Sequence, residues 1–194
     1  MCVFISGDGE LYTSGCNDNW QLGRRTPGST SSARPTHVTA LESYNVVAAG
    51  CGATHTLALT DQGAVLGWGG NEYGQTGSGS EGADQHQPRH IKGLADQRVV
   101  AAGENHSAAL TADGRLYTWG RGKHGQLGQG DWANRHRPVL VTSLRGIRAK
   151  QVSAGSRHSL VLTTTSQVFA FGNNDFGQVR RTAEDGRWPY DRTL

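Results

Sequence analysis

The chain has 194 residues, which allows one domain of ordinary size. Its 28 glycines are about 14% of the chain, roughly twice the usual share, and with only five prolines they indicate turns and exclude collagen and proline-rich linkers. The net charge of +3 is too small by itself to imply binding to nucleic acid. No apolar run approaches the roughly 18 residues that cross a bilayer, and the first residues lack the regions of a signal peptide, so we expect neither.

Cysteine usage bears on the compartment and on metal binding. The chain has three cysteines, Cys2, Cys16 and Cys51, and no two of them have CxxC spacing. An odd number without that spacing argues against a disulfide framework and a zinc site, and it fits a reducing compartment. We therefore expect an intracellular protein, cytoplasmic or nuclear, with no metal or other cofactor.

A repeat with a period of 51 to 52 residues runs through the sequence. A Gly-x-x-His motif occurs three times, and each copy is followed by an aromatic residue and a second glycine-rich motif. The recurring positions are Gly52, Gly103 and Gly155, then His55, His106 and His158, then Trp68, Trp119 and Phe171. A third motif, proline with leucine six residues later, begins at Pro35, Pro88 and Pro138. Repetition at such a period indicates an array of similar structural units.

In chain order, the predicted units of the single domain 1–194 are 1–46, 47–97, 98–149 and 150–194. The first unit is incomplete at its start, because residues 5–15 match residues 110–120 and Met1 therefore falls at the position of the repeat histidine. In the second unit we expect four strands, near residues 46–50, 56–60, 64–69 and 89–93, and the later units repeat this pattern. An Asp-Gly pair between apolar runs, as at Asp113, favours a hairpin. No segment shows helical periodicity.

The combination of Gly-x-x-His-Ser/Thr with Trp-Gly-x-Asn-x-x-Gly-Gln-Leu-Gly resembles the repeat of the regulator of chromosome condensation family, over essentially the whole chain. Local departures are Trp20 in place of a glycine, Gly122 in place of asparagine and Arg180 in place of a glycine. The resemblance implies an all-β fold, a β-propeller of four-stranded blades, and family members form seven-bladed rings. At about 52 residues per unit the chain makes about 3.7 units. We therefore expect an incomplete propeller of about four blades, with apolar end faces that favour self-association.

The repeated side chains have a structural and a chemical interpretation. Because the histidines recur at one position in successive units, they lie far apart, and we expect each to hydrogen-bond the backbone of its own blade instead of binding a metal or a substrate. We expect the repeated aromatic residues in the core between blades. The segment 120–125 matches G-x-G-x-x-G, but no predicted helix follows it to bind phosphates. No Ser-His-Asp pattern stands out. The sequence therefore predicts no catalytic, cofactor-binding or metal-binding residues, and no enzyme.

One segment has an unusual charge. Residues 121–150 hold seven basic residues and one acidic residue, a formal charge of +6 in a chain of +3. The basic residues are Arg121, Lys123, Arg135, Arg137, Arg145, Arg148 and Lys150, and the acidic one is Asp131. One interpretation is a solvated loop with Trp132 covering the blade edge. The other is a binding edge for an acidic partner, formed by Trp132, Arg135, Arg137, Arg121 and Lys123 on the loop between the third and fourth strands, with the tryptophan as anchor.

Two functions follow from these observations. The prediction is a protein-interaction scaffold with no chemistry of its own. The alternative, which the resemblance implies, is guanine nucleotide exchange on a Ran-like small GTPase with chromatin association, because exchange factors open the nucleotide site of a partner and need no catalytic set of side chains. Either function needs a protein partner, with an acidic surface or chromatin as a further one. The family also includes a plant ultraviolet-B receptor, but this chain has Ala53, Glu104 and Ser156 at the positions of its light-sensing tryptophans.

Overall fold

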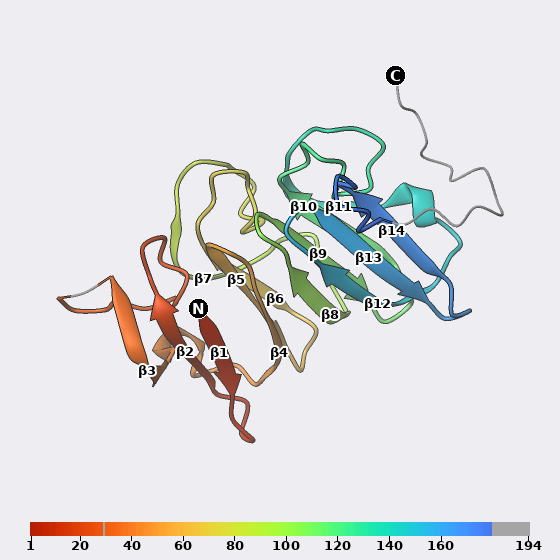
Figure 1. Cartoon of the computed structure of the whole chain (residues 1–194). Helices are drawn as coiled ribbons and strands as arrows, with labels where there is room; N and C mark the ends of the chain where they lie inside the picture. The colour runs from red at the N-terminus through yellow and green to blue at the C-terminus, as the bar shows by residue number, and fades with distance from the viewer. Residues whose placement is uncertain (29, 180–194) are drawn as a thin grey trace.

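The computed structural model describes residues 1–28 and 30–179. Within these residues the regular structure consists of fourteen β-strands and two 3-10 helices of three residues each. The strands form four antiparallel sheets that lie side by side in chain order (Figure 1). The fold class predicted from the sequence, an all-β propeller, is confirmed, and each sheet is one blade.

The bounds of the elements follow the repeat. The first blade contains β1 (Cys2–Ile5), β2 (Leu11–Cys16) and β3 (Ser31–His37). The second contains β4 (Val46–Cys51), β5 (His55–Thr60), β6 (Val65–Gly69) and β7 (Gln85–His90). The third contains β8 (Gln97–Ala102), β9 (His106–Thr111), β10 (Leu116–Gly120) and β11 (Arg135–Leu140), and the fourth contains β12 (Ala149–Ala154), β13 (His158–Thr163) and β14 (Val168–Gly172). The helix η1 (Thr39–Leu41) follows β3, and η2 (Thr142–Leu144) follows β11.

The fourth strand of the second blade differs from the prediction near residues 89–93. The strand β7 covers Gln85–His90 and pairs with β6, with Leu66 opposite His90 and Gly69 opposite Gln85. Pro88 lies inside it, which is possible because β7 is the outermost strand and needs no N–H donor toward a further strand. Gly93, with φ of +84°, belongs to the turn that leads to the next blade.

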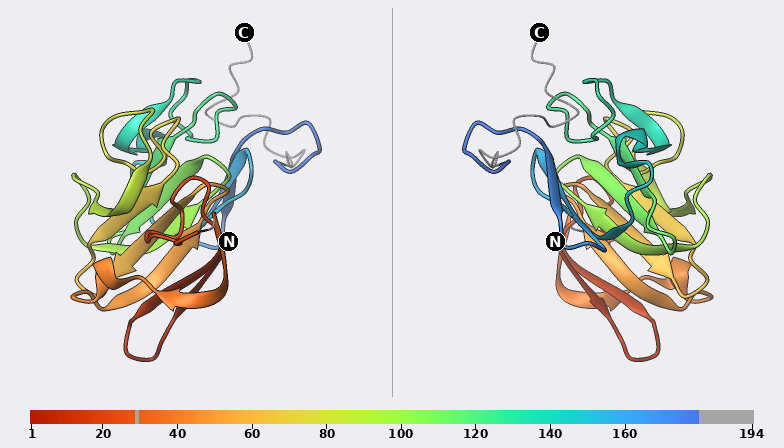
Figure 2. Two further views of the ribbon diagram at one scale, coloured as in Figure 1. Left: turned by 90° about the vertical axis from the view of Figure 1, so that its left-hand side faces the viewer. Right: turned by 90° about the vertical axis from the view of Figure 1, so that its right-hand side faces the viewer.

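The inner strands show that the sheets are arranged as propeller blades. A Cβ atom added to Gly50 in β4 would lie 3.1 Å from the amide nitrogen of Ala102 in β8, so the first strands of these two blades touch through their backbones. The side views show the blades stacked face to face in chain order, with the first blade in front in the left-hand view (Figure 2). None of the helical segments in residues 1–28 and 30–179 has the length and apolar character needed to span a bilayer.

The main apolar cores lie between neighbouring blades. Trp68 of the second blade is fully buried in a cluster with Leu11, Val38 and Leu41 of the first blade. Trp119 of the third blade is fully buried in the equivalent cluster with residues of the second. The second and third blades are therefore each stabilised by the face of the blade before them.

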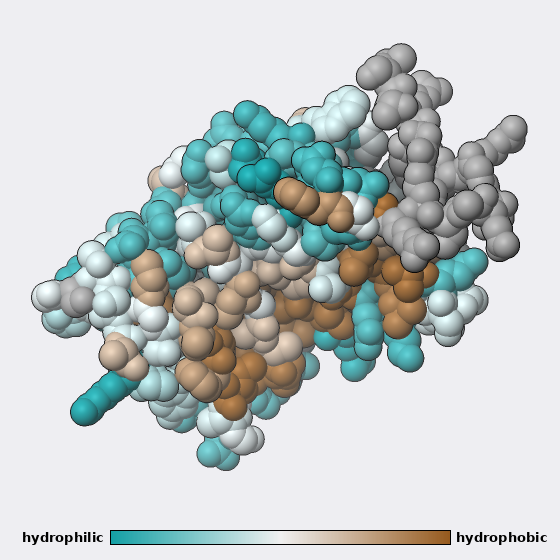
Figure 3. Space-filling view, viewed as in Figure 1, coloured by the Kyte–Doolittle hydropathy of each residue, from teal (hydrophilic) through white to brown (hydrophobic). Residues whose placement is uncertain are grey.

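Apolar side chains are exposed at the two ends of the row of blades. Phe4 in β1 is 49% exposed and Val168 in β14 is 56% exposed. Apolar surface gathers over β1 and β4 and over the fourth blade, whereas the loops along the top are hydrophilic (Figure 3). Self-association of the 194-residue chain through these faces stays a prediction, and sedimentation would measure it.

Candidate partner-binding surface

The antiparallel strand order places the connections of each blade alternately at its two ends. The long-loop face, as we call it, carries the Gly-x-x-His turns and the loops that follow the third strands, including residues 70–84 and 121–134. The short-turn face carries the hairpins between the second and third strands and the links between blades, including residues 91–96 and 141–148. A side chain is therefore assigned to a face by the connection in which it lies.

The loop 121–134 on the long-loop face is held in place by its own polar groups. The amide of Gly122 donates to Oδ1 of Asn134 over 3.0 Å, and the hydroxyl of Thr118 donates to the carbonyl oxygen of the buried Leu127 over 2.7 Å. A Cβ atom at Gly122 would lie 2.0 Å from the carbonyl oxygen of Ala133, which explains why this unit lacks the asparagine of the other repeats. The loop is thus a fixed platform for the side chains that it exposes.

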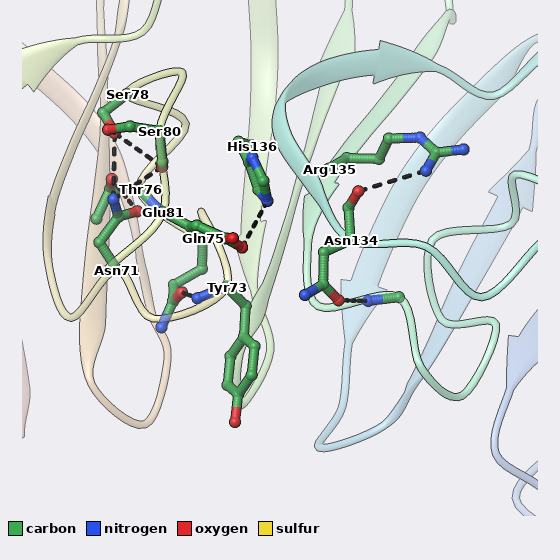
Figure 4. Close-up of polar contacts among 11 residues, drawn as sticks. Asn71, Tyr73, Gln75, Thr76, Ser78, Ser80, Glu81, Asn134, Arg135 and His136 are labelled. Atoms are coloured by element: carbon green, nitrogen blue, oxygen red, sulfur yellow. Dashed lines mark hydrogen bonds and ion pairs between the residues drawn. The ribbon is translucent and has the colours of Figure 1, made fainter. Parts of the chain in front are cut away.

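In the second blade Asn71 performs the equivalent task. Its Oδ1 accepts hydrogen bonds from the amide and the hydroxyl of Thr76, and its Nδ2 donates to Ser78 and to the carbonyl oxygen of Ser80 (Figure 4). The loop 70–84 is therefore also fixed, and it lies against the third blade.

The structure places the five predicted binding residues in different settings. Trp132 is 63% exposed, and Lys123 is exposed in the same loop. Arg135 and Arg137 lie in the strand β11, so their predicted place in the loop is wrong: β11 starts at residue 135 because Gly120 pairs with Arg135. Arg121 stacks over the ring of Tyr73 in the second blade, with its guanidinium carbon 4.7 Å from the ring centroid.

Several of these cationic side chains already contact neighbouring residues of the chain. Arg135 forms an ion pair with Asp131 in which Nη2 and Oδ2 are 2.6 Å apart. The side chain of Arg137 lies against Gly79 of the second blade, and the amide of Gly79 donates to the carbonyl oxygen of His136 over 2.9 Å. Trp132 and Lys123 are exposed and, within residues 1–28 and 30–179, their side chains are not among those that form hydrogen bonds, ion pairs or ring contacts.

A further polar side-chain contact joins the second and third blades. Oε2 of Glu81, in the loop 70–84, lies 2.8 Å from Nε2 of His136 in β11 (Figure 4). Counted forward from the repeat tryptophan, Trp132 matches Glu81 of the second unit, and nothing in the sequence indicates that Glu81 faces the third blade.

The structure divides the basic segment 121–150 between both faces. Arg121 and Lys123 lie in the long-loop connection, and Arg135 is at that end of β11. Arg145 and Arg148 lie beyond β11, in the connection on the short-turn face, and Lys150 begins the next blade there. The predicted edge of Trp132, Arg135, Arg137, Arg121 and Lys123 stays a prediction, and the three cations that it does not include lie beyond β11 on the other face.

The repeat histidines bind the next blade, and the predicted bond to the backbone of their own blade is wrong. Nε2 of His55 is 2.8 Å from Oγ of Ser107 in the third blade, and Nε2 of His106 is 2.9 Å from Oγ of Ser159 in the fourth. Because Ser107 donates its proton to the carbonyl oxygen of Gln75 over 2.8 Å, its oxygen accepts from Nε2–H of His55. His158, in the fourth blade, is only partly buried, and no such bond to another described residue is present.

The same carbonyl oxygen also anchors the repeat tryptophan. Nε1 of Trp119 donates to the carbonyl of Gln75 over 2.9 Å, and Nε1 of Trp68 donates to the carbonyl of Gln21 over 2.8 Å. Phe171 has no N–H to donate and packs, partly buried, against the core between the third and fourth blades. Each glycine of Gly-x-x-His makes room for the histidine: a Cβ at Gly52 would lie 2.3 Å from the ring of His55, and Gly103 and Gly155 have the same contact.

We expect Ser107→Ala to lower the free energy of unfolding by about 1–3 kcal/mol, because it leaves the buried Nε2–H of His55 without an acceptor. Urea unfolding followed by intrinsic fluorescence measures the change. Ser153→Ala, at an exposed serine of β12, is the matched control and should change stability by less than about 0.5 kcal/mol. Equal effects of the two substitutions would contradict the assigned hydrogen bonds.

The structure also places the glycine-rich segment, the cysteines and Trp20, which the sequence singled out. The G-x-G-x-x-G segment 120–125 leads from β10 into the long loop and not into a helix. The cysteines are free and exposed. Within residues 1–28 and 30–179, no three His, Cys, Asp or Glu side chains are placed to hold a metal ion. Trp20 has φ of +61° where the other units have glycine, and its ring stacks on His86 of the second blade at a centroid distance of 4.1 Å.

The sequence matches the RCC1-like domain over residues 1–191. The chain belongs to the RCC1-like domain family. The resemblance predicted from the Gly-x-x-His and Gly-Gln-Leu-Gly motifs is thereby confirmed.

Curated relatives of this RCC1-like domain include ubiquitin ligases and a photoreceptor. The human E3 ubiquitin-protein ligase HERC2 is 37% identical over 179 residues, which cover 90% of this chain and 4% of HERC2. The rat protein HERC4, a probable E3 ubiquitin-protein ligase, is 44% identical, with 91% of this chain and 22% of HERC4 covered. The ultraviolet-B receptor UVR8 of Arabidopsis thaliana is 34% identical, with 92% of this chain and 40% of the receptor covered. The chain thus spans less than half the length of each.

Solved structures of the family have the same arrangement of blades. Prp20p of Saccharomyces cerevisiae, described with its binding to Gsp1p and histones, superimposes with a TM-score of 0.78 at 28% identity, over 97% of this chain and 44% of Prp20p. Human WBSCR16 gives a TM-score of 0.78 at 26% identity, over 89% of this chain and 45% of WBSCR16.

Proposed function

We propose that this RCC1-like domain is a protein-interaction scaffold that acts by binding and contributes no chemistry of its own. The observation that carries the proposal is Trp132, which is 63% exposed on a loop that hydrogen bonds hold in place. A large exposed aromatic side chain on a rigid support is typical of the anchor of a protein interface. The core of the blade does not use this side chain, so its place at the surface is explained by a partner.

The charge around Trp132 favours a partner with an acidic surface. Lys123 is exposed in this loop, whereas the equivalent positions of the other units hold acids, namely Asp18, Glu72 and Asp175. Arg121, Arg135 and Arg137 add positive charge beside it, although each also contacts neighbouring residues of this chain. Exposed cations of this kind raise the rate of association with acidic surfaces and set the dependence on salt.

A capture experiment with two variants tests the scaffold. The immobilised chain is incubated with cell extract, and the bound proteins are quantified by mass spectrometry at two salt concentrations. We expect Trp132→Ala to reduce the recovery of specific partners about tenfold without changing the salt dependence, because the side chain contributes apolar area. Lys123→Ala with Arg137→Ala should weaken the binding and also flatten its salt dependence. If both variants retain the same proteins as the unchanged chain, Trp132 is not the anchor.

Guanine nucleotide exchange on a Ran-like small GTPase, with chromatin association, is the second candidate. Its support is the likeness to Prp20p, which was described with its binding to Gsp1p and histones. Release of a fluorescent GDP analogue from Gsp1p tests it. Acceleration by catalytic amounts of the chain would favour exchange, and capture of partners without acceleration would favour the scaffold.

A further inference from the structure

Three exposed cations gather on the short-turn face of the third and fourth blades. Arg145, Arg148 and Lys150 are all exposed, and the ion pairs among the described residues involve other side chains. The backbone that carries them is fixed, because the amide of Ala149 donates to the carbonyl oxygen of Gly114 over 3.0 Å and the amide of Thr164 donates to that of Arg148 over 2.9 Å. The backbone at Arg148 and Ala149, within the six residues that carry all three cations, is thus held in place.

The repeat does not require cations at these positions. The residue that accepts a hydrogen bond from the neighbouring hairpin is Asn45 in the second blade, Asp96 in the third and Arg148 in the fourth, at distances of 2.9, 3.0 and 2.9 Å. The fold therefore accepts a neutral, an acidic or a basic side chain at this point. The positive charge of the fourth blade is a property of this surface and not of blade packing.

Lys150 occupies a β-bulge that recurs in each inner strand. Ala149 pairs with Thr163 and Gln151 pairs with Leu162, so Lys150 is the extra residue between them. The same shift surrounds Val47 in the second blade and Arg98 in the third. A bulged residue has no partner across the sheet, and its side chain is free to face solvent or a ligand.

The hairpin beside these cations also differs in charge from the corresponding hairpins of the other blades. The corresponding hairpins of the first three blades each hold an aspartate, namely Asp8, Asp61 and Asp113, whereas residues 163–167 hold threonines, a serine and a glutamine. Ser166 has φ of +63° where Gly9, Gly63 and Gly114 stand, so a hydroxyl is present at a position that favours glycine. The loss of an acid and the gain of hydroxyl donors both favour an anionic ligand.

The acidic residues near the cluster do not neutralise it. The hairpin of the third blade also adjoins Arg148, but its Asp113 forms an ion pair with Arg115 in which Nε and Oδ2 are 2.8 Å apart. The other exposed acids of this face lie in the connections and hairpins of the first three blades; they are Asp8, Glu10, Glu42, Asp61 and Asp96. Those acids share their side of the face with the exposed cations Lys92 and Arg98, whereas residues 141–168 contain no acidic residue.

We propose that Arg145, Arg148 and Lys150, with the hydroxyls of Thr164 and Ser166, form a second binding surface that takes an acidic peptide segment of a protein partner. Arginine binds carboxylates through paired N–H donors, and the exposed Val168 adjoins the hairpin as an apolar contact. Residues 141–150 and 163–168 include no aromatic side chain on which a nucleic-acid base could stack. This surface goes beyond the proposed function, because it lies on the face opposite Trp132.

Fluorescence anisotropy with a fluorescein-labelled octaglutamate peptide tests the proposal on the 194-residue chain. We expect the triple variant Arg145→Glu, Arg148→Glu and Lys150→Glu to bind the peptide at least about tenfold more weakly. The matched control, Arg25→Glu, Arg34→Glu and Arg89→Glu, makes the same change in net charge at exposed positions outside the cluster and should weaken binding less than about threefold.

The outcomes separate the alternatives. Equal weakening by the two triple variants would overturn the proposal, because net charge alone would then explain the attraction, and so would tighter binding of a single-stranded oligonucleotide than of octaglutamate. Thermal unfolding checks that the variants fold, and Arg148→Gln with Lys150→Gln replaces the triple variant if it does not. Trp132→Ala, which tests the proposed function, should leave octaglutamate binding unchanged. Each proposal can therefore be contradicted without affecting the other.

Discussion

Trp119→Ala is expected to lower the free energy of unfolding by about 3–5 kcal/mol, the cost of removing a buried aromatic side chain from a packed core. Trp119 is fully buried in the cluster between the second and third blades. Its Nε1–H also donates to the carbonyl oxygen of Gln75, so the substitution removes a cavity-filling ring and one hydrogen bond between blades. Denaturation in urea, followed by circular dichroism, measures the loss.

Trp132→Ala is the matched control for this measurement. Trp132 is 63% exposed, and its removal should change the free energy of unfolding by less than about 0.5 kcal/mol. Trp119→Phe should have an intermediate effect, because Phe171 occupies this repeat position in the fourth blade without an N–H donor. A loss of several kcal/mol for Trp132→Ala would show that Trp132 is part of the core and would remove the anchor of the proposed binding surface.

The repeat made the fold predictable from the sequence because the same packing problem is solved in each unit. Gly69 and Gly120 illustrate this. A Cβ atom at Gly69 would lie 2.5 Å from the carbonyl oxygen of Thr54, and one at Gly120 would lie 2.7 Å from that of Asn105. Only glycine fits, and the period of the glycines therefore reports the period of the blades. The aromatic residue that precedes each of these glycines recurs with the same period.

Contacts between units were not predictable from the repeat. The partner of His55 is Ser107, which lies in the next unit, and a motif within one unit does not indicate which neighbour its side chains meet. A signal was nevertheless present, because each repeat histidine is followed by Thr56, Ser107 or Ser159, and each of these hydroxyls donates to the loop of the preceding blade.

The charge of +6 counted over residues 121–150 does not describe a single surface, although the predicted edge used only residues up to Arg137. Residues 121–150 are continuous in sequence, but the strand β11 crosses the blade in the middle of the segment. Charges at its two ends are therefore carried to opposite faces. Charge counted along a sequence describes a surface only when the chain does not reverse between the charged residues.

The stability of the chain is expected to fall steeply between pH 6.5 and pH 4, because two buried histidines are neutral in the folded state. Burial lowers the pKa of His55 to about 3, with a smaller contribution from the neighbouring His106. Burial also lowers the pKa of His106 to about 4, helped by His158 and opposed by Glu104. Both values lie below the ordinary histidine pKa of about 6.5 that applies to the unfolded chain.

The direction of the effect follows from proton binding. Between these pKa values the unfolded chain binds more protons than the folded chain, so acid favours unfolding. The stabilisation is complete above pH 6.5 and is lost as the pH falls toward the folded pKa values, at up to about 1.4 kcal/mol per pH unit for each histidine. Between pH 7 and pH 5 the two histidines together should remove roughly 3–4 kcal/mol.

A variant that keeps the hydrogen bonds but does not titrate isolates this effect. In His55→Gln with His106→Gln, the amide Nε2 can still donate to Ser107 and Ser159, while no imidazole remains to take up a proton. Urea unfolding at pH 7 and pH 5 should show the drop in the unchanged chain and a much smaller one in the variant, with the remaining change due to other groups. If both chains lose the same stability, the histidines are accessible to water in the folded state, and the closed seams between blades that the hydrogen bonds describe do not form in solution.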